Sequence, residues 1–201
     1  MKDIPIFTGY EGIASLILRQ IPYNGTAFVL IRSVFGTTEA LIRECAEFCH
    51  AAGAETVCYG GDGDFSGREV YAHVIERTIR RSALPKTAAV ARPAADPNEW
   101  LGIYRQRFSN VPAATCFPST QNALTVFDGD TPIGIGRVEG GCIRLLAATV
   151  PGRGADCVAA LAAHCLGEIV TLSCAEENLP AMRLYDRLGF SRGATKEIWY
   201  R

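Results

Sequence analysis

Two polar residues near the end of the sequence are spaced so that one bound ligand could contact both. Asn178 and Tyr185 lie seven residues apart in a segment with helical periodicity, which places them on one face of a helix, about 10 Å apart. Asn178 can cap this helix, and Gly189 can end it in a left-handed turn. Each residue also has an ordinary interpretation, because a tyrosine at an apolar helical position is usually a core residue and an asparagine before a helix is usually only a cap. The apolar positions of the helix are Ala181, Leu184, Tyr185 and Leu188.

A glycine-rich turn, Val150-Pro-Gly-Arg-Gly154, is a second candidate for ligand binding. It lies between an apolar, β-rich run and a predicted helix, so backbone N–H groups at the start of that helix could bind an anion such as a phosphate. Asp156 follows in the first helical turn, where its negative charge opposes an anionic ligand, and Arg153 can compensate. A Gly-x-Gly pattern alone is weak evidence, and its value here comes from its position.

The elements around these residues follow from composition and periodicity. Ile169–Cys174 is a β-branched, apolar run that ends at the polar Glu176 and Glu177, so a strand leads directly into the helix that Asn178 caps. Asp96, Pro97 and Glu99 mark another helix start. The remaining predicted elements are a strand at 88–91, a hairpin of 123–127 and 132–138, a strand at 142–150 and a helix at 155–166.

The segment Asn178–Phe190 resembles the N-x-x-A-x-x-L-Y-x-x-L-G-F signature of the GNAT family of N-acetyltransferases, and the element order over residues 88–201 is that of the GNAT domain. This resemblance implies an α/β, or layered α+β, fold: a mixed central sheet flanked by helices. It also implies an enzyme that transfers an acetyl group from acetyl-CoA to an amine of a small molecule or peptide, without a metal.

The resemblance further implies roles for individual residues. Tyr185 would donate a proton to the departing CoA thiolate, main-chain N–H groups of 148–150 would hold the thioester carbonyl, and the glycine-rich turn would bind the pyrophosphate. The family's pyrophosphate motif, R/Q-x-x-G-x-G/A, fits in two ways: either Arg153 matches its first residue and Asp156 and Val158 replace its glycines, or Gly152 and Gly154 are the loop glycines. The implied acetyl-CoA contacts are Ala148, Thr149, Val150, Gly152, Arg153, Gly154, Ala155, Asp156, Asn178 and Tyr185.

A general base is not identified. The strand Ile143–Val150 contains no acid, and the weak candidates Glu139, Glu176 and Glu177 are more typical of solvated surface carboxylates. By the same resemblance, the acceptor contacts would come from the first helix of the domain and its loop, although most of those aromatic residues are expected to be core. They are Trp100, Tyr104, Phe108 and Phe117.

The first half of the chain repeats the order of strand, helix, strand and helix, at 25–34, 38–52, 55–59 and 69–81. We therefore expect a degenerate, smaller GNAT-like half-domain at 1–87, joined at the break Ser82–Thr87 to a GNAT acetyltransferase domain at 88–201. The first domain has no counterpart of the Asn178 and Tyr185 signature, so we expect it to be structural or to help shape the acceptor site. Arg77, Arg80 and Arg81 are expected at a solvated helix end.

Composition limits the class of protein. The chain has 201 residues, of which 48% are hydrophobic, and a formal charge of −1 with a pI near 6.3, which argue for a folded protein and against nucleic-acid binding. We expect neither a membrane segment nor a signal peptide, and a cytoplasmic location; a homodimer stays open. Seven of the eight cysteines lie in apolar patterns and are expected to be reduced core residues, including the Cys45 and Cys49 pair, while Cys116 is a possible exposed thiol.

Three functions are compatible with this sequence. The first is an acetyl-CoA-dependent N-acetyltransferase. The second is a catalytically silent domain that binds an acyl-CoA or a protein partner, which Asp156 favours. The third is a purely structural protein, which would be favoured if Asn178 and Tyr185 were buried and satisfied by protein groups.

Overall fold

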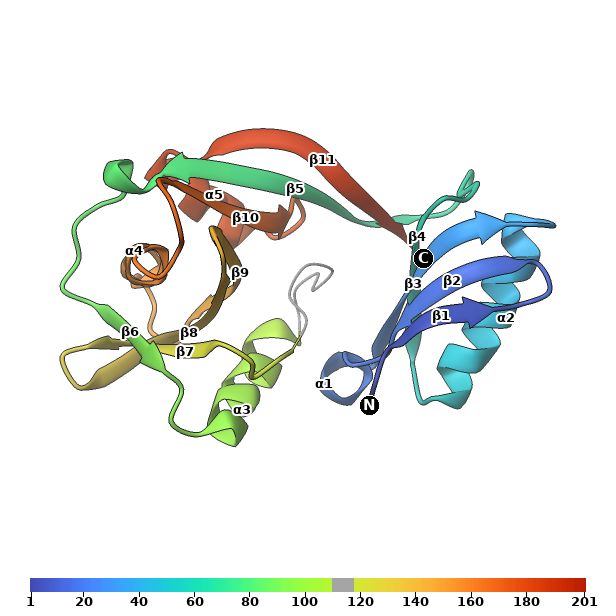
Figure 1. Ribbon diagram of the computed structural model, residues 1–201, viewed down its shortest axis with the longest axis horizontal. Coiled ribbons are helices and arrows are strands. Elements are labelled where there is room, and N and C mark those ends of the chain that lie inside the picture. The colour runs from blue at the N-terminus through green and yellow to red at the C-terminus, as the bar shows by residue number, and fades with distance from the viewer. Residues whose placement is uncertain (110–117) are drawn as a thin grey trace. The chain divides into compact units, whose positions relative to one another are not determined.

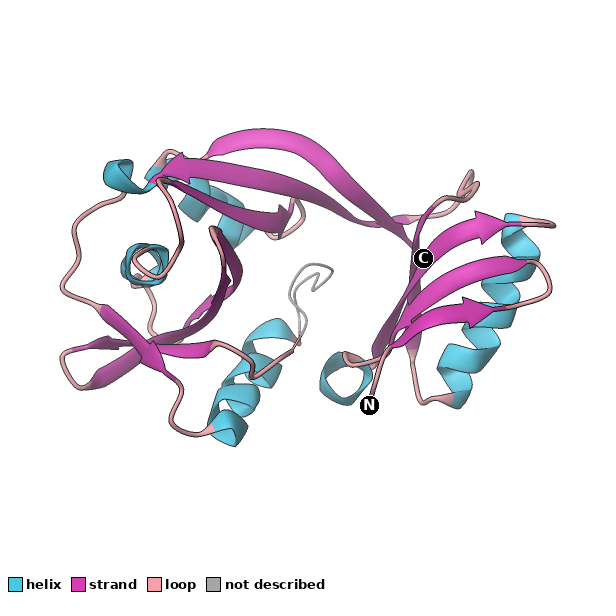
Figure 2. Cartoon of the chain, viewed as in Figure 1, coloured by secondary structure: helices cyan, strands magenta, loops and turns pink. Residues whose placement is uncertain are grey.

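The computed structural model describes residues 1–109 and 118–201, which form two compact units (Figure 1). Unit 1 comprises Met1–His73 and Glu197–Arg201, and unit 2 comprises Val74–Lys196. Among the described residues, the hydrogen-bonded strand order is β1-β2-β3-β4-β11-β5-β10-β9-β8-β7-β6. Strands and helices thus form the mixed, layered α+β fold that the sequence predicts (Figure 2). No helix in the described ranges is long and apolar enough to cross a membrane.

Unit 1 is a sheet with a long helix along one face (Figure 1). Thr37 caps that helix by accepting a hydrogen bond from the Ala40 N–H at 3.2 Å, and the helix buries one stripe that includes Cys45 and Cys49 against the sheet. Strand β2 pairs antiparallel with both β1 and β3. Strands β3 and β4, which the long helix connects, pair parallel, and β4 pairs antiparallel with β11. The elements are β1 (Ile4–Thr8), β2 (Gly12–Ile17), α1 (Ile21–Asn24), β3 (Thr26–Val34), α2 (Thr38–Ala51), β4 (Thr56–Gly61), the start of β5 (Val70–Arg80) and the end of β11 (Ser191–Tyr200).

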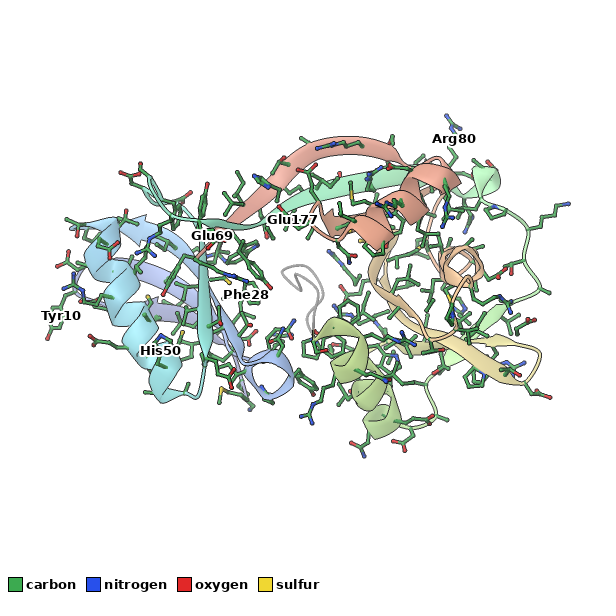
Figure 3. The ribbon with its side chains drawn as sticks, turned by 180° about the vertical axis from the view of Figure 1, so that it is seen from behind. Tyr10, Phe28, His50, Glu69, Arg80 and Glu177 are labelled. Carbon is green, nitrogen blue, oxygen red and sulfur yellow. The ribbon has the colours of Figure 1, made fainter. Side chains whose placement is uncertain are left out.

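The opposite face of β3 is aromatic. Phe28, labelled in Figure 3, is fully buried and packs 5.1 Å from the Trp199 ring and 6.1 Å from the Tyr71 ring, both ring centroid distances. Its neighbours Ala27 and Val29 face the helix side, as the alternation of a strand requires. Unit 1 therefore buries apolar side chains on both faces of its sheet.

Unit 2 repeats this order of pairings around the helix α4. Strand β8 pairs antiparallel with both β7 and β9. Strands β9 and β10, which α4 connects, pair parallel, and β10 pairs antiparallel with β5. Gly136 lets α4 approach β8 closely, because a Cβ there would lie 2.3 Å from the Leu161 side chain. The elements are the rest of β5, β6 (Val90–Pro93), α3 (Pro97–Phe108), β7 (Ala123–Asp128), β8 (Thr131–Glu139), β9 (Cys142–Ala148), α4 (Gly154–Ala162), β10 (Ile169–Ala175), α5 (Leu179–Leu188) and the start of β11.

Most predicted elements are confirmed, including the capped helix α3. The Asp96 side chain accepts a hydrogen bond from the Asn98 N–H at 2.8 Å, and the helix buries Trp100, Tyr104 and Phe108. The Trp100 indole donates to the Leu124 carbonyl at 3.1 Å, which fixes the helix to β7. Three of the four aromatic residues proposed as acceptor contacts are thus core residues, and the fourth, Phe117, lies outside the described residues.

The helix predicted at 69–81 is wrong, because Val70–Arg80 is the strand β5. The apolar residues Tyr71, Val74, Ile75 and Thr78 fit a helical stripe, but they are β-branched or aromatic residues that favour an extended chain. The β10 edge selects the strand, since β5 pairs with it from Ile169↔Arg80 through Ala175↔Val74. The repeat between the two halves therefore ends after strand, helix and strand, and unit 1 has no counterpart of α5.

Arg77 does not lie at a solvated helix end either. It is 2% exposed in β5, where it donates to the Asp186 carboxylate at 2.7 Å and to the Phe190 carbonyl at 3.3 Å. Both partners belong to α5 or the turn that follows it. Arg77 therefore holds α5 against β5 through a partly buried ion pair.

The compact units divide at a different position from the expected boundary between residues 87 and 88. The division falls inside β5, between His73 and Val74, and the last residues of the chain join unit 1. The cause is strand pairing, since β5 completes the sheet of unit 2 beside β10, and β11 completes the sheet of unit 1 with Tyr200 opposite Tyr59.

The described cysteines are all free, and apart from the partly exposed Cys142 they are buried, as expected for reduced core residues. Burial raises the pKa of Cys45 to about 12 and that of Cys157 to about 11, so these thiols are protonated at neutral pH. Cys116 lies outside the described residues. The described residues contain no group of three His, Cys, Asp or Glu side chains that could hold a metal ion.

Removing β5 should prevent unit 2 from folding. A fragment of residues 74–196 keeps the β10–β5 ladder and the Arg77–Asp186 pair, whereas a fragment of 88–196 exposes the β10 edge and leaves Asp186 without that partner. We expect cooperative thermal unfolding by circular dichroism for the longer fragment, and aggregation or no cooperative transition for the shorter one. Equal unfolding midpoints for the two fragments would contradict this role of β5.

Candidate functional site

The neighbouring strands β9 and β10 separate along their length. In the part of the chain that the structure describes, their parallel pairing is limited to Thr171↔Cys142 and Leu172↔Ile143, near the start of both strands. On the other side of β9, the register with β8 shifts at the same point: Val138 pairs with Ile143, and Arg137 pairs with Leu145. Arg144 is therefore an extra, bulged residue in β9, and bulges bend and twist a strand away from its neighbour.

The divergence leaves backbone donors of β9 directed toward the gap. The Thr149 N–H donates to the Ile133 carbonyl of β8 at 2.8 Å, and in an antiparallel pair the backbone groups alternate between the two sides of a strand. By this alternation, the N–H groups of Leu146 and Ala148 point away from β8, toward β10. Ala148 is a predicted contact, Leu146 was not predicted, and the Thr149 N–H is already engaged in the sheet.

A cavity lies in the angle between the two strands and contains both residues of the sequence motif. Asn178, at the start of α5, and Tyr185, two turns later, line it together with residues of β9, β10 and α3. The two residues of the predicted ligand-facing pair therefore line one cavity. The described lining residues are Phe108, Ile143, Arg144, Leu145, Leu146, Leu172, Ser173, Cys174, Ala175, Asn178, Ala181 and Tyr185.

The helix α5 forms as the sequence predicts. The Asn178 side chain accepts from the Ala181 N–H at 3.4 Å, and Gly189 ends the helix with φ of 83°. Tyr185 is 6% exposed and packs 5.4 Å from the Phe190 ring, so most of its side chain belongs to the core. Asn178 is partly exposed. Each residue therefore has a structural role in addition to its place on the cavity wall.

The glycine-rich turn lies at the N-terminus of α4, directly after β9. Gly152 has φ of 81°, a conformation that favours glycine, whereas Gly154 allows a close approach of α5, because a Cβ there would lie 2.8 Å from the Leu184 side chain, which would have to shift. The N–H groups of Gly154, Ala155 and Asp156 are first-turn donors for which the described residues show no acceptor. This helix start can therefore bind an anion through its backbone, and the arrangement favours Gly152 and Gly154 as the loop glycines.

The charged side chains of this turn bind one another. Arg153 donates to Asp156 at 2.6 Å and to Asp128 at 2.7 Å, and the Thr87 hydroxyl donates to Asp156 at 2.7 Å. The Arg153 guanidinium and then the Thr87 hydroxyl hold the pKa of Asp156 below its usual value, so this carboxylate stays charged. Two carboxylates on one guanidinium leave a net negative charge beside the start of α4, which weakens the site for an anion.

The remaining predicted positions have varied environments. Val150 is exposed two residues after the end of β9, and the neighbouring Thr149 carbonyl accepts a hydrogen bond from Arg107 of α3 at 2.5 Å. Among the base candidates, Glu139 is 3.4 Å from Arg137 and 3.2 Å from Arg144, and Glu176 pairs with Arg192. Glu177, labelled in Figure 3, is exposed. None of the three acids is among the described residues that line the cavity.

The corresponding strands of unit 1 do not separate. The parallel pairing of β3 with β4 continues from Thr26↔Thr56 through Ile31↔Gly61, and the β2–β3 register shift lies beyond this ladder, between Ile13 and Ala14 of β2. Unit 1 therefore lacks the gap that forms the cavity in unit 2.

Comparison with solved structures identifies the fold. A conserved protein of unknown function from Staphylococcus epidermidis is 12% identical, with a TM-score of 0.60 over 96% of this chain and 92% of that one. A GCN5-related N-acetyltransferase from Kribbella flavida is 13% identical, with a TM-score of 0.55 over 97% of this chain, which spans 58% of its length. A GCN5-related N-acetyltransferase from Sphaerobacter thermophilus is 16% identical, with a TM-score of 0.50 over 94% of this chain and 74% of that one.

These likenesses show that the chain has a GNAT fold, the general fold of this class of acyltransferases. No protein-family model and no curated protein sequence matches the chain. The fold agrees with the resemblance found in the sequence, and the separated strands of unit 2 give it a cavity at the position that the Asn178–Phe190 motif borders.

Replacing Asp156 by Asn should strengthen binding of CoA while weakening the fold. Removing this charge frees one arm of Arg153 and lowers the negative charge at the start of α4, so we expect CoA affinity to rise by roughly fivefold in calorimetric titrations. Asp130→Asn, an exposed turn carboxylate, is the matched control. Unchanged affinity for Asp156→Asn would mean that the carboxylate does not act on the ligand.

The stability effect of Asp156→Asn has a defined pH dependence. Because the folded-state pKa of Asp156 is lowered, its stabilisation is fully present above about pH 4 and is lost as the pH falls through the folded-state pKa. The variant should thus be less stable than the wild type at pH 7, by under about 1 kcal/mol for this partly exposed group. The difference should vanish in acid.

Proposed function

We propose that this chain is an acetyl-CoA-dependent N-acetyltransferase whose acyl donor binds between β9 and β10 of unit 2. The observation that carries the proposal is the separation of these two strands at the Arg144 bulge, next to Asn178 and Tyr185. The acceptor is an amine of a small molecule or peptide, and we propose a cytoplasmic protein without nucleic-acid or membrane partners.

The residues present fit such a donor in part. Leu145, Leu146 and Leu172 give the cavity an apolar wall for an extended acyl-carrying arm. By the strand alternation, N–H groups of β9 point away from β8, and the first-turn N–H groups of α4 have no acceptor among the described residues. The carboxylates of Asp128 and Asp156 oppose the pyrophosphate electrostatically. We therefore expect binding that relies on backbone hydrogen bonds and burial more than on charge.

The chemistry is nucleophilic attack of an amine on a thioester. The Leu146 and Ala148 N–H groups would hold the carbonyl oxygen as negative charge develops on it, and Tyr185 would donate a proton to the departing thiolate. Since the described cavity wall contains no carboxylate, the amine would arrive in its neutral form or lose its proton to water. Asn178 would orient the donor from the start of α5.

A second candidate function is a catalytically silent domain that binds an acyl-CoA or a protein. The specific observation in its favour is the Asp128–Arg153–Asp156 cluster, in which the Arg153 guanidinium is already neutralised by two carboxylates. We also propose that unit 1 binds no acyl donor, because its β3–β4 ladder leaves no gap.

Titration with acetyl-CoA should stabilise the protein. A ligand that binds only the folded state raises the free energy of unfolding by about 2.7 kcal/mol at one hundred times its Kd, which corresponds to roughly 5–10 °C in the unfolding midpoint. Differential scanning fluorimetry measures this shift directly. The absence of any shift at millimolar acetyl-CoA would count against the proposed function.

Tyr185→Phe should separate catalysis from folding. The substitution keeps the ring that packs on Phe190 and removes the hydroxyl, so we expect acetyl-CoA binding to survive while turnover falls by roughly 10²–10⁴-fold. Turnover can be followed by release of free CoA thiol with a panel of amines. Tyr59→Phe in unit 1, where Tyr59 is equally 6% exposed, is the matched control and should keep full activity.

A structural tyrosine would give a different result. Loss of a buried hydroxyl costs about 1 kcal/mol of stability and leaves turnover nearly unchanged. Wild-type turnover in the Tyr185→Phe variant would thus remove Tyr185 from the mechanism.

A further inference from the structure

We propose that the cavity between β9 and β10 selects a substrate that carries a carboxylate close to the reacting groups, and that Arg144 binds this carboxylate. The inference rests on the proposed function, because it names the class of substrate that the same cavity would accept. It excludes polycationic amines, such as polyamines, as preferred acceptors.

Arg144 occupies the position in the cavity where the two strands begin to separate. It is the bulged residue of β9, adjacent to Ile143, the last residue of β9 described as paired with β10. Arg144 is one of the residues that line the cavity, and its side chain is 51% exposed, so the guanidinium is accessible to a ligand. Among the described lining residues, Arg144 is the one that carries a charge.

A second arginine adds to this positive charge. Glu139 lies 3.2 Å from the Nε atom of Arg144 and 3.4 Å from an Nη atom of Arg137, so one carboxylate serves two guanidinium groups. The Arg137 side chain is 14% exposed, and its buried Nε–H has no hydrogen-bond partner in the described residues. Arg137, Glu139 and Arg144 together therefore carry a net charge of about +1, and their guanidinium groups keep N–H donors that Glu139 does not use.

Nearby acids do not cancel this charge at the cavity. Glu176, directly after β10, is paired with Arg192, and Glu177 is exposed on the turn that follows; neither lines the cavity. A guanidinium can bind a carboxylate on the ligand through two parallel hydrogen bonds. An ammonium group on the ligand has no acceptor for these hydrogen bonds, and its charge has the same sign as that of the guanidinium. The charge and the donor geometry thus favour an anionic substrate over a cationic one.

The carboxylate could belong to either of two substrates. It could be part of the acceptor, as in an amino acid or an acidic peptide terminus, or part of the acyl group, as in a dicarboxylic acyl-CoA. Both place the same chemical group beside Arg144, so the experiment needs an arm for each.

Binding measurements on the full-length protein can test this without turnover. The acceptor arm compares N-acetylalanine with its neutral analogue N-acetylalaninamide, alone and with saturating CoA, and the donor arm compares succinyl-CoA with acetyl-CoA. In one of the two arms, we expect the carboxylate compound to bind about tenfold more tightly. Arg144→Gln should reduce this ratio to near one. Arg192→Gln, at an exposed arginine that also pairs with a glutamate, should keep it.

These binding measurements distinguish a failure of the carboxylate proposal from a failure of the proposed acetyltransferase function. Discrimination in the acceptor arm assigns the carboxylate to the amine substrate, and discrimination in the donor arm assigns it to the acyl group. Equal binding in both arms, or a ratio that survives Arg144→Gln, would overturn the proposal, even if acetyl-CoA binds. Failure of acetyl-CoA to stabilise the protein would instead contradict the acetyltransferase, whereas Arg144-dependent binding of N-acetylalanine would still support the carboxylate site.

Discussion

The bulge at Arg144 is the constraint on which the site in unit 2 depends. One extra residue in β9 shifts its register against β8, and the pairing of β9 with β10 ends beside it, at Ile143. Past this point β9 and β10 are no longer paired with each other in the described part of the chain, so the β9 N–H groups that point toward β10 are not used by the sheet. The elements that carry the remaining site residues follow directly from the ends of these strands: α4 begins after β9, and α5 begins after β10. The separation of the two strands thus leaves a cavity and a row of backbone donors, and the strand ends lead into the helices that carry the other site residues.

The two units show how the same order of pairings can produce different sites. In each unit a parallel strand pair is connected by one helix, yet β3 and β4 stay paired through Ile31↔Gly61 while β9 and β10 separate. In unit 1, apolar side chains are buried on both faces of the sheet, with Phe28 packed against Trp199 on one face and α2 packed on the other. Unit 2 in turn needs β5, because Arg77 of that strand holds α5, the helix that bears Asn178 and Tyr185.

The sequence predicts the parts of the fold that rest on local signals. Helix α5 has a cap at Asn178 and a stop at Gly189, and both act as expected. The sequence predicts a helix in place of strand β5 because the apolar residues of this segment satisfy both the helical and the strand period, and pairing with β10, a contact between distant segments, decides between them. Strand β11 carries no alternation to recognise, since most of its residues are exposed. The bulge at Arg144 is equally invisible in the sequence, because a register shift is a property of two strands, so the cavity's main cation was not among the predicted site residues.

Amide hydrogen exchange with and without acetyl-CoA tests the central claim most directly. If the acyl donor binds between β9 and β10, the Leu146 and Ala148 amides and the first turn of α4 should become protected from exchange. The Thr149 amide, already bonded to Ile133, and the β3–β4 amides of unit 1 should change little. Protection confined to unit 1, or no protection in β9 at a ligand concentration that stabilises the protein, would contradict a binding site between these strands.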